Sequence, residues 1–476
     1  MLASYAAALP EVNLRDEKFF VQLRAEEFSR LDAGGHAYLD YTGSALYAER
    51  QVRAHAELLS RSVFGNPHSE NPASLESTRV IDEARARVLR FLDAPAEDYA
   101  VVFTANASAA IKLVAESFPF GKEAGLVLTA DNHNSINGIR EFARKAGAPF
   151  QYIPLDDQLR LAQPELLLSR VAPSERGLFA FPAQSNFSGV KHPLSLVRRA
   201  KTLGYKVLLD AAAFVPTSQL SLRTVPADFV VLSFYKVFGF PTGVGALVAR
   251  RSSLAELMRP WFAGGTLEYA SVQNDRHLLR PAADGAFEDG TPAFLSIAAL
   301  EEGFKLLDEV GVRRLNTHVM RLTAYLLDGL RQLQHPDGSP LVKIYGPPSM
   351  KDRGPTIAFN VLDRAGQTIP FQSVEARARD DGVSLRGGCF CNPGASEAAF
   401  GLRAEDTTRC LDQISDGFSI ERFAECLGPS VPVGAVRASI GLANNFADLD
   451  RALGVARSYC GRPAPTFQWA SSFPSL

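Results

Sequence analysis

A single lysine stands at the end of an apolar run, where its amine could carry chemistry. Lys236 follows Phe229–Leu232, an apolar run typical of a strand, and lies between Tyr235 and Val237. Glycine and proline residues, which interrupt regular structure, come soon after it. Apolar surroundings favour the neutral amine of lysine, which can then form a Schiff base with a carbonyl compound. The same local sequence would also fit a lysine that ends a strand and points into solvent. Residues elsewhere in the chain are needed to distinguish the two.

Other polar side chains also follow apolar runs. Because ligands bind at the carboxyl ends of parallel strands, residues in these positions are expected to meet. They are Ala107 and Ser108, His133, Gln184 and Asn186, Asp210, and Ser233. The stretch from Thr104 to Ala109 suits an anion site at a helix N-terminus, or a simple serine N-cap. Asp210 is a carboxylate in apolar surroundings, and such a group needs a partner.

Together these groups suit pyridoxal 5'-phosphate. A helix N-terminus would bind its phosphate, a carboxylate its ring nitrogen, an amide its phenolic oxygen, an imidazole its ring face, and a lysine its aldehyde. The combination is much more specific than any one of these motifs.

Apolar strands alternate with helices from about residue 100 to 250. The expected strands are 100–103, 126–128, 151–153, 178–181, 207–209, 229–232 and 245–248, and the expected helices are 108–117, 135–145, 164–171 and 194–203. This alternation predicts an α/β fold with a mostly parallel, doubly wound sheet that helices cover on both faces.

The chain of 476 residues is long enough for two or three domains. We expect an N-terminal segment, 1–60, associated with the small domain and the active-site entrance. A large cofactor-binding domain, 61–330, and a small α+β domain, 331–476, would follow. Residues 462–476 read as a surface tail.

Composition excludes several classes of partner. A net charge of -2 shows no excess of basic residues that would bind nucleic acid or an anionic membrane. No apolar stretch is long enough to span a bilayer. The start of the chain lacks the basic region of a signal peptide. The five cysteines are Cys389, Cys391, Cys410, Cys426 and Cys460. Their odd number favours reduced thiols in the cytoplasm over a disulfide framework.

Several motifs carry a family resemblance over nearly the whole chain. They are 38–43, 66–69, 131–135, 182–189, 233–243, 262–266, 287–292, 386–394 and 434–439, together with Asp210 placed 26 residues before Lys236. The chain resembles the class V aminotransferase and cysteine desulfurase group of fold-type I pyridoxal-phosphate enzymes. Its narrowest resemblance is to the N-terminal desulfurase domain of molybdenum cofactor sulfurases.

The resemblance implies roles toward the cofactor. Lys236 would form the Schiff base and later move protons, Asp210 would hold the pyridine nitrogen, and His133 would stack on the ring, with Asn132 as the alternative. The remaining cofactor contacts implied are Asn186 with Gln184 nearby for the phenolic oxygen, and Ala107, Ser108, Ser233 and Tyr235 for the phosphate. Thr266 would reach the phosphate from the partner subunit of a homodimer.

The resemblance also implies a substrate site and a thiol. Arg437 would bind the substrate carboxylate, helped by Arg386, Gly43 and Asn186. Cys391 would take sulfur from L-cysteine, giving L-alanine and an enzyme persulfide for transfer to an acceptor protein or to the molybdenum cofactor.

The surroundings of Cys391 are read as those of a reactive thiol on a mobile loop. Gly387, Gly388 and Gly394 would give the loop freedom, and Arg386 would favour the thiolate. Cys389 could shelter a persulfide or form a redox pair. A zinc knuckle lacks a second pair of ligands, and no metal is expected.

Two departures leave alternatives open. Ser396 stands where the sulfurases often have a further cysteine, and the chain ends at Leu476 without the molybdenum-cofactor domain, so a separate acceptor is plausible. Ala213 stands where many desulfurases have histidine or glutamine, which leaves the proton-transfer group open. The alternatives are a C–S lyase, epimerase or aminotransferase acting on another amino acid, and a binding protein without turnover. Selenocysteine also stays open as a substrate.

Overall fold

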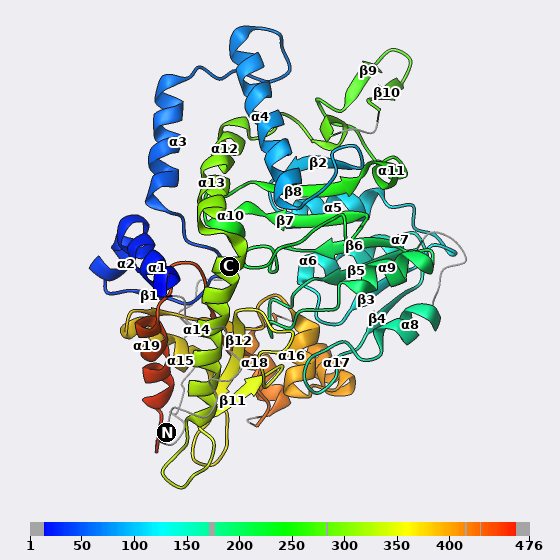
Figure 1. Cartoon of the computed structure of the whole chain (residues 1–476). Helices are drawn as coiled ribbons and strands as arrows, with labels where there is room; N and C mark the ends of the chain where they lie inside the picture. The colour runs from blue at the N-terminus through cyan, green and yellow to red at the C-terminus, as the bar shows by residue number, and fades with distance from the viewer. Residues whose placement is uncertain (1–13, 171–176, 282–283, 415–416, 429, 463–476) are drawn as a thin grey trace.

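A seven-stranded sheet forms the centre of the protein (Figure 1). The computed structural model describes residues 14–170, 177–281, 284–414, 417–428 and 430–462. The strands lie in the order β2 (Tyr99–Thr104), β8 (Gly245–Arg250), β7 (Phe229–Ser233), β6 (Lys206–Asp210), β5 (Leu178–Pro182), β3 (Leu126–Thr129) and β4 (Phe150–Ile153). β8 runs antiparallel to both its neighbours, and the remaining pairs are parallel. The predicted mostly parallel sheet is confirmed.

Helices cover both faces of this sheet, as the continuous apolar strands predict. Within β5, Phe179 and Phe181 pack into one core, while Leu178 and Ala180 pack into another. The first core includes α4 (Pro72–Phe91), α9 (Ser195–Thr202) and α13 (Leu300–Val310), and the second includes α5 (Ala107–Ser117) and α7 (Ile139–Lys145).

One expected helix is divided. The stretch 135–145 forms α6 (Asn134–Asn137) and α7, with Gly138 between them. Further along the chain, α12 (Phe294–Ala298) comes directly before α13. The short helices α8 (Pro164–Arg170), α10 (Phe234–Phe238) and α11 (Arg251–Leu254) follow or precede strands of the central sheet. No helix within the described ranges is both long and apolar enough to cross a bilayer.

A second, antiparallel sheet follows the long helix α14 (Val312–Gln332). Its strand order is β11 (Val342–Tyr345), β12 (Thr356–Val361), β15 (Ala435–Ser439) and β14 (Arg386–Gly388). The helices α15 (Phe371–Asp380) and α19 (Phe446–Arg457) pack beside it. This is the mixed α and β pattern expected after about residue 340; the predicted tail mostly lies outside the described residues.

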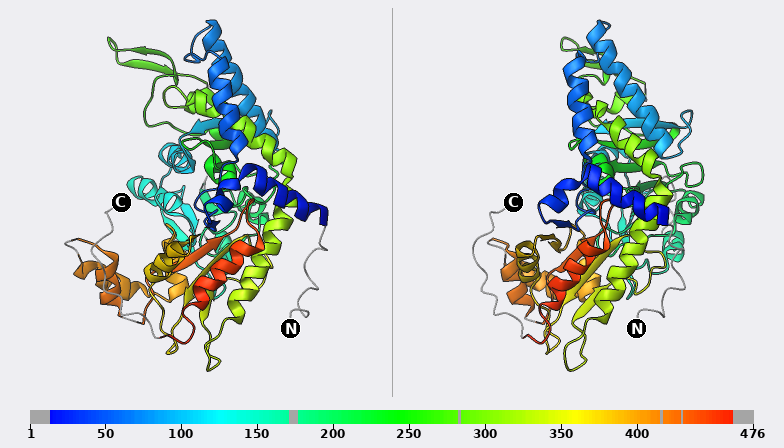
Figure 2. Two further views of the ribbon diagram at one scale, coloured as in Figure 1. Left: turned by 90° about the vertical axis from the view of Figure 1, so that its left-hand side faces the viewer. Right: turned by 60° about the vertical axis from the view of Figure 1, so that its left-hand side comes forward.

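The N-terminal segment lies beside the C-terminal elements. β1 (Ala37–Tyr38) pairs in parallel with β13 (Val383–Ser384), and Figure 2 shows α1 (Leu14–Glu27) and α2 (Ser29–Ala33) next to α19. The chain then passes into α3 (Glu49–Arg61), which packs against α13. Residues 37–45 thus cross the junction between the two sheets.

Three helices lie in the chain between β14 and β15. They are α16 (Pro393–Phe400), α17 (Ala404–Gln413) and α18 (Ile420–Leu427). Cys410 of α17 and Cys426 of α18 form a disulfide, while Cys389, Cys391 and Cys460 are free. The prediction that all five thiols are reduced is therefore wrong. An odd count excludes complete pairing only, and two adjoining helices bring this pair together.

A hairpin of β9 (Leu267–Ser271) and β10 (Arg276–Leu279) projects from the large sheet (Figure 1). The 3₁₀ helix η2 (Asp284–Phe287) then returns the chain to the edge strand β2. Asp284 accepts a hydrogen bond from Val101 N, and Glu288 accepts one from Phe103 N. These carboxylates satisfy N–H groups that an edge strand would otherwise expose.

Candidate active site

Lys236 and Asp210 come from neighbouring strands of the large sheet. Asp210 is the last residue of β6, and Lys236 lies in α10, which directly follows β7. Burial lowers the pKa of the Lys236 amine, and the charge of Arg437 acts in the same direction, while Asp210 opposes both. The lowered pKa increases the share of neutral amine, the form that reacts with carbonyl groups.

His133 lies beside this pair. Its half-buried ring is the N-cap of α6, and Nδ1 accepts a hydrogen bond from Ser135 N at 3.1 Å. Burial lowers the pKa of His133, and the nearby charge of Asp210 opposes the shift. Asn132 is fully buried, and its amide donates to Thr129 O and Ala180 O. His133 is thus the residue of the two that lies near Lys236 and Asp210.

The N-terminus of α5 brings together Ala107, Ser108 and Ser233, three of the residues predicted to hold the phosphate. Ala107 N donates to Ser233 Oγ at 2.9 Å, and Ser108 Oγ lies 2.6 Å from Ser135 Oγ. The serine N-cap alternative is wrong, because Asn106 caps the helix through Ala109 N. The exposed Ser108 hydroxyl is left at the helix end, where the macrodipole favours an anion.

Tyr235 adjoins the loop that carries Gly43. Its carbonyl oxygen accepts a hydrogen bond from Ala45 N at 3.1 Å. Its phenol is half-buried, and burial raises its pKa, so it stays a hydrogen-bond donor at neutral pH. Thr266 lies apart from this group, at the base of the β9–β10 hairpin, where its hydroxyl bonds the backbone of Ala263.

Asn186 connects the cofactor side of the site to the thiol loop. Its Nδ2 donates to Phe390 O at 2.7 Å, and its Oδ1 accepts from Asn392 Nδ2 at 2.8 Å. An amide nitrogen carries two hydrogens, so Asn186 can make a further donation. Gln184 is buried two residues earlier, and its Oε1 has no hydrogen-bond partner among the described residues.

Cys391 is exposed on a short turn between β14 and α16. Phe390 and Cys391 both have positive φ, 55° and 54°, and Cys391 O accepts from Asn134 N at 2.8 Å. Asn392 is fully buried, donates to Asp131 O at 2.7 Å, and caps α16 through Ala395 N. The turn is therefore pinned to the loop that carries His133.

The glycines beside Cys391 serve close packing. A Cβ at Gly394 would overlap Ala130 O, and one at Gly387 would overlap Phe371 and Glu375. The prediction that these two glycines supply loop freedom is wrong, because backbone and side chains from distant parts of the chain fill the space. Sequence reasoning also missed Asn392, although an Asn-Pro pair is typical of a capped helix start.

Two arginines and one aspartate meet beside Asn186, and the two arginines are those predicted to bind the substrate carboxylate. Asp40 Oδ2 accepts from Arg386 Nη2 at 2.6 Å, and Asp40 Oδ1 accepts from Arg437 Nη2 at 3.0 Å. Arg437 Nη1 also donates to Asn186 O at 2.9 Å. Arg386 therefore already has a carboxylate partner in Asp40. Sequence reasoning included Asp40 in a motif but gave it no role.

Gly43 leaves space for this ion pair. A Cβ there would lie 2.6 Å from Asp40 Oδ2 and 2.7 Å from Arg386 Nη2. The structure thus brings Lys236, Asp210, His133, Asn186, Arg386, Cys391 and Arg437 together around one site, with Gly43 at its edge.

The model of the class-V aminotransferase family matches residues 37–452. The chain belongs to this family. As a class-V aminotransferase family member it takes pyridoxal 5'-phosphate, and the residues described above fit that cofactor. The α5 N-terminus with Ser108 and Ser233 would hold its phosphate, Asp210 its ring nitrogen and Lys236 its aldehyde, while the bound ring would supply an electron sink.

This family member is similar to curated proteins named molybdenum cofactor sulfurase. It is 38% identical over 469 residues to the protein of Drosophila melanogaster, and 34% identical over 485 residues to that of Arabidopsis thaliana. These matches cover 91% and 94% of this chain, but the chain spans only 59% of the length of each relative.

Solved structures share the fold. A cysteine desulfurase from Thermococcus onnurineus superposes with a TM-score of 0.73 at 24% identity, covering 92% of this chain and 97% of that one. Cysteine desulfurase CsdA from Escherichia coli gives a TM-score of 0.72 at 20% identity, covering 92% and 98%. The fold-type I architecture expected from the sequence is confirmed.

Proposed function

We propose that this protein is a cysteine desulfurase that uses pyridoxal 5'-phosphate. It would convert L-cysteine to L-alanine and leave the sulfur as a persulfide on Cys391. The observation that carries the proposal is the exposed Cys391 thiol near Lys236, on a turn whose backbone accepts hydrogen bonds from Asn134 N and Asn186 Nδ2. The similarity to proteins named molybdenum cofactor sulfurase supports it.

The residues fit the chemistry of such a transfer. The Cys391 thiolate would attack the sulfur of bound L-cysteine, so that an S–S bond forms as the Cβ–S bond breaks. The electron pair of the broken bond stays with carbon, which takes up a proton to give L-alanine. Lys236 is the group placed to move protons at the substrate, because burial lowers the pKa of its amine.

A matched set of variants tests this function. Wild-type holoenzyme given L-cysteine should release L-alanine and carry an alkylatable persulfide, while Cys391→Ala should lose the persulfide. Lys236→Ala should lose the absorbance band of the lysine-bound cofactor. Cys460→Ala removes a free thiol from the turn that follows α19 and should behave as wild type.

The alternative is another class V reaction on a different amino acid, a C–S lyase, epimerase or aminotransferase. Alanine with free sulfide at an unchanged rate in Cys391→Ala would establish a lyase. A cofactor band with no response to L-cysteine would instead redirect the search to other amino acids.

We further propose a homodimer in which Thr266 reaches the phosphate of the partner subunit. Large apolar side chains are exposed on the hairpin and the segment before it: Met258, Trp261, Phe262, Tyr269, Val272, Leu278 and Leu279. Such a patch is typical of an interaction surface. Light scattering of wild type and Tyr269→Glu tests it, since a wild-type monomer would refute the dimer.

The sulfur acceptor is proposed to be the molybdenum cofactor or a separate acceptor protein, in line with the names of the curated relatives. Transfer of labelled sulfur from the persulfide to either acceptor, measured in parallel, would distinguish them. We also propose a cytoplasmic location, where a free Cys391 thiol persists. Cell fractionation with an antibody to the protein tests it.

A further inference from the structure

Two like charges face each other across β14 and β15. Arg386 of β14 lies directly opposite Arg437 of β15 in the antiparallel register. Like charges in directly opposed positions repel and destabilise a strand pair. The cost is greatest for Arg437, which is 2% exposed and stacks on the Phe390 ring at 4.7 Å. The pair therefore needs a compensating anion.

Asp40 supplies that anion. Its carboxylate accepts from Arg386 Nε at 2.9 Å and Nη2 at 2.6 Å, and from Arg437 Nη2 at 3.0 Å. Asp40 is itself 8% exposed. A buried carboxylate shared by two guanidinium groups holds both in fixed orientations through charge-assisted hydrogen bonds.

The backbone around Asp40 is fixed on both sides. Ser439 N, from the strand of Arg437, donates to Leu39 O at 2.7 Å, and Tyr41 N donates to Ser439 O at 3.3 Å. Asp40 therefore keeps its place between the arginines through contacts that do not involve them.

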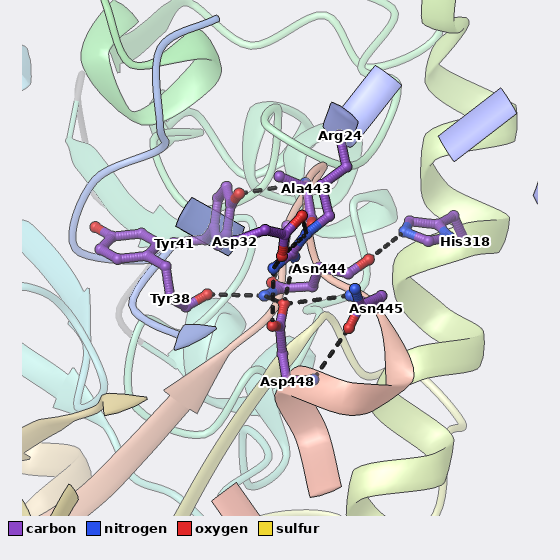
Figure 3. Close-up of polar contacts among 10 residues, drawn as sticks. Arg24, Asp32, Tyr38, Tyr41, His318, Ala443, Asn444, Asn445 and Asp448 are labelled. Carbon is purple, nitrogen blue, oxygen red and sulfur yellow. Dashed lines mark hydrogen bonds and ion pairs between the residues drawn. The ribbon is translucent and has the colours of Figure 1, made fainter. Parts of the chain in front are cut away.

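A buried polar network reinforces this attachment (Figure 3). Asn444 Nδ2 donates to Tyr38 O at 2.8 Å and to Asp448 Oδ2 at 2.9 Å, and Arg24 Nη1 donates to the same carboxylate at 2.7 Å. Ala443 N donates to the Tyr41 hydroxyl at 3.2 Å. The residues on either side of Asp40 are thus held to the turn between β15 and α19. The position of Asp40 is therefore fixed before any ligand binds.

The fixed Asp40 determines the net charge of the group formed by Asp40, Arg386 and Arg437. Within this ion-paired group, two guanidinium groups and one carboxylate leave one net positive charge, which one substrate carboxylate neutralises. The neighbouring Glu375 accepts a hydrogen bond from Gly387 N, and burial raises its pKa, which favours its neutral form. The exposed donors left for the substrate carboxylate are on the Arg386 side chain, which is 49% exposed. Arg437 Nε has no hydrogen-bond partner among the described residues, but it is buried beside Asp40 and acts on the ligand through its charge. A second acid group would meet Asp40 instead of a free arginine.

We propose that Asp40 is a specificity-determining residue that admits amino acids with one carboxylate and rejects those with an acidic side chain. The inference rests on the proposed function only in taking an amino acid as the ligand. It depends on the Asp40–Arg386–Arg437 geometry, whatever reaction follows.

Calorimetric titration of the holoenzyme with L-alanine and with L-aspartate tests the charge count. Asp40→Asn leaves two positive charges, so the ratio of the Kd for L-aspartate to that for L-alanine should fall at least about tenfold, which is about 1.4 kcal/mol. Arg386→Gln leaves none, and L-alanine binding should weaken by at least about tenfold. The double variant Asp40→Asn with Arg386→Gln restores one charge and should return the ratio toward wild type.

A matched control uses the same segment. Glu49→Gln removes an acid of α3 that pairs with the exposed Arg53 and whose side chain is 54% exposed, outside the site and the network in Figure 3, and it should leave the ratio unchanged. An equal change in both Kd values in Asp40→Asn, or no recovery in the double variant, would overturn the proposal. Thermal unfolding checks each variant, and if Asp40→Asn fails to fold, an unchanged Kd for L-alanine in Arg386→Gln decides against it.

The outcome is separable from that of the proposed function. A holoenzyme that makes no L-alanine from L-cysteine, yet shows these changes in Kd, would refute the desulfurase and leave the role of Asp40 standing. Desulfurase activity without charge-dependent binding would do the reverse.

Discussion

Replacing Asn392 by aspartate should both destabilise the protein and separate substrate binding from sulfur transfer. Asn392 Nδ2 donates to Asp131 O at 2.7 Å and to Asn186 Oδ1 at 2.8 Å, in a fully buried position. Aspartate keeps the oxygen that caps α16 at Ala395 N but turns both donations into contacts between oxygens. The variant thus changes the thiol turn while preserving the helix cap.

The magnitude follows from those contacts. Two lost hydrogen bonds and a buried acceptor without a donor together cost about 2 to 5 kcal/mol. The displaced thiol should lower the rate of persulfide formation on Cys391 by about a hundredfold. The absorbance change on adding L-alanine should persist, because Asn392 contacts Asn186 only at its side-chain oxygen, whereas Arg437 is held by the backbone carbonyl oxygen of Asn186.

Urea unfolding and single-turnover persulfide labelling of holoenzyme measure the two effects. Asn71→Asp is the control, because Asn71 also caps a helix, through Ser74 N, while its Nδ2 makes only an exposed bond to Ser69. This control should change the unfolding free energy by less than about 0.5 kcal/mol. Wild-type stability together with a wild-type persulfide rate in Asn392→Asp would refute the reasoning.

Three further predictions concern space and charge. Gly43→Ala places a Cβ 2.6 Å from Asp40 Oδ2 and should raise the KM for L-cysteine, whereas Gly121→Ala, with nothing within 4 Å of the new Cβ, should not; equal KM values would count against the ion-pair site. Burial lowers the pKa of His318 from 6.5 to about 4, so its contribution to stability is present above pH 6.5 and is lost as the pH falls toward 4; His318→Gln should lose about 3 kcal/mol less over this window in pH-dependent urea unfolding. Burial raises the pKa of Glu288 from 4.5 to about 7, so its contribution is present below pH 4.5 and is lost as the pH rises through 7; Glu288→Gln should remove about 3 kcal/mol of that loss, and parallel pH profiles for variant and wild type would contradict it.

The large sheet and the position of Lys236 at its edge were predictable from local sequence. Runs such as Phe229–Leu232 are apolar throughout because both faces of the strand are covered, and the polar residue after each run then lies at the sheet edge. The antiparallel direction of β8 was not predictable in this way. Its composition resembles that of its parallel neighbours, since burial and not direction determines which residues it carries.

The partners of the site residues were harder to predict. Asp40 is separated from Arg386 by 346 residues and from Arg437 by 397, and only the three-dimensional fold shows that one carboxylate serves both. The role of Gly394 was equally hidden in the sequence. A glycine there suggests a flexible loop, but in the fold Ala130 O occupies the space that a side chain would need. Local patterns report the element that a residue belongs to, whereas these roles depend on what packs against it.

The register of β14 and β15 allows the chain between these two strands to vary in length. Arg386 and Arg437 are held opposite each other by hydrogen bonds between adjacent strands, although α16, α17 and α18 intervene in the chain. The helices after α16 can therefore lengthen, shorten or be exchanged without altering the distance between the two arginines. A new module could therefore be inserted at α17 and α18 without moving the strand pair that holds the two arginines.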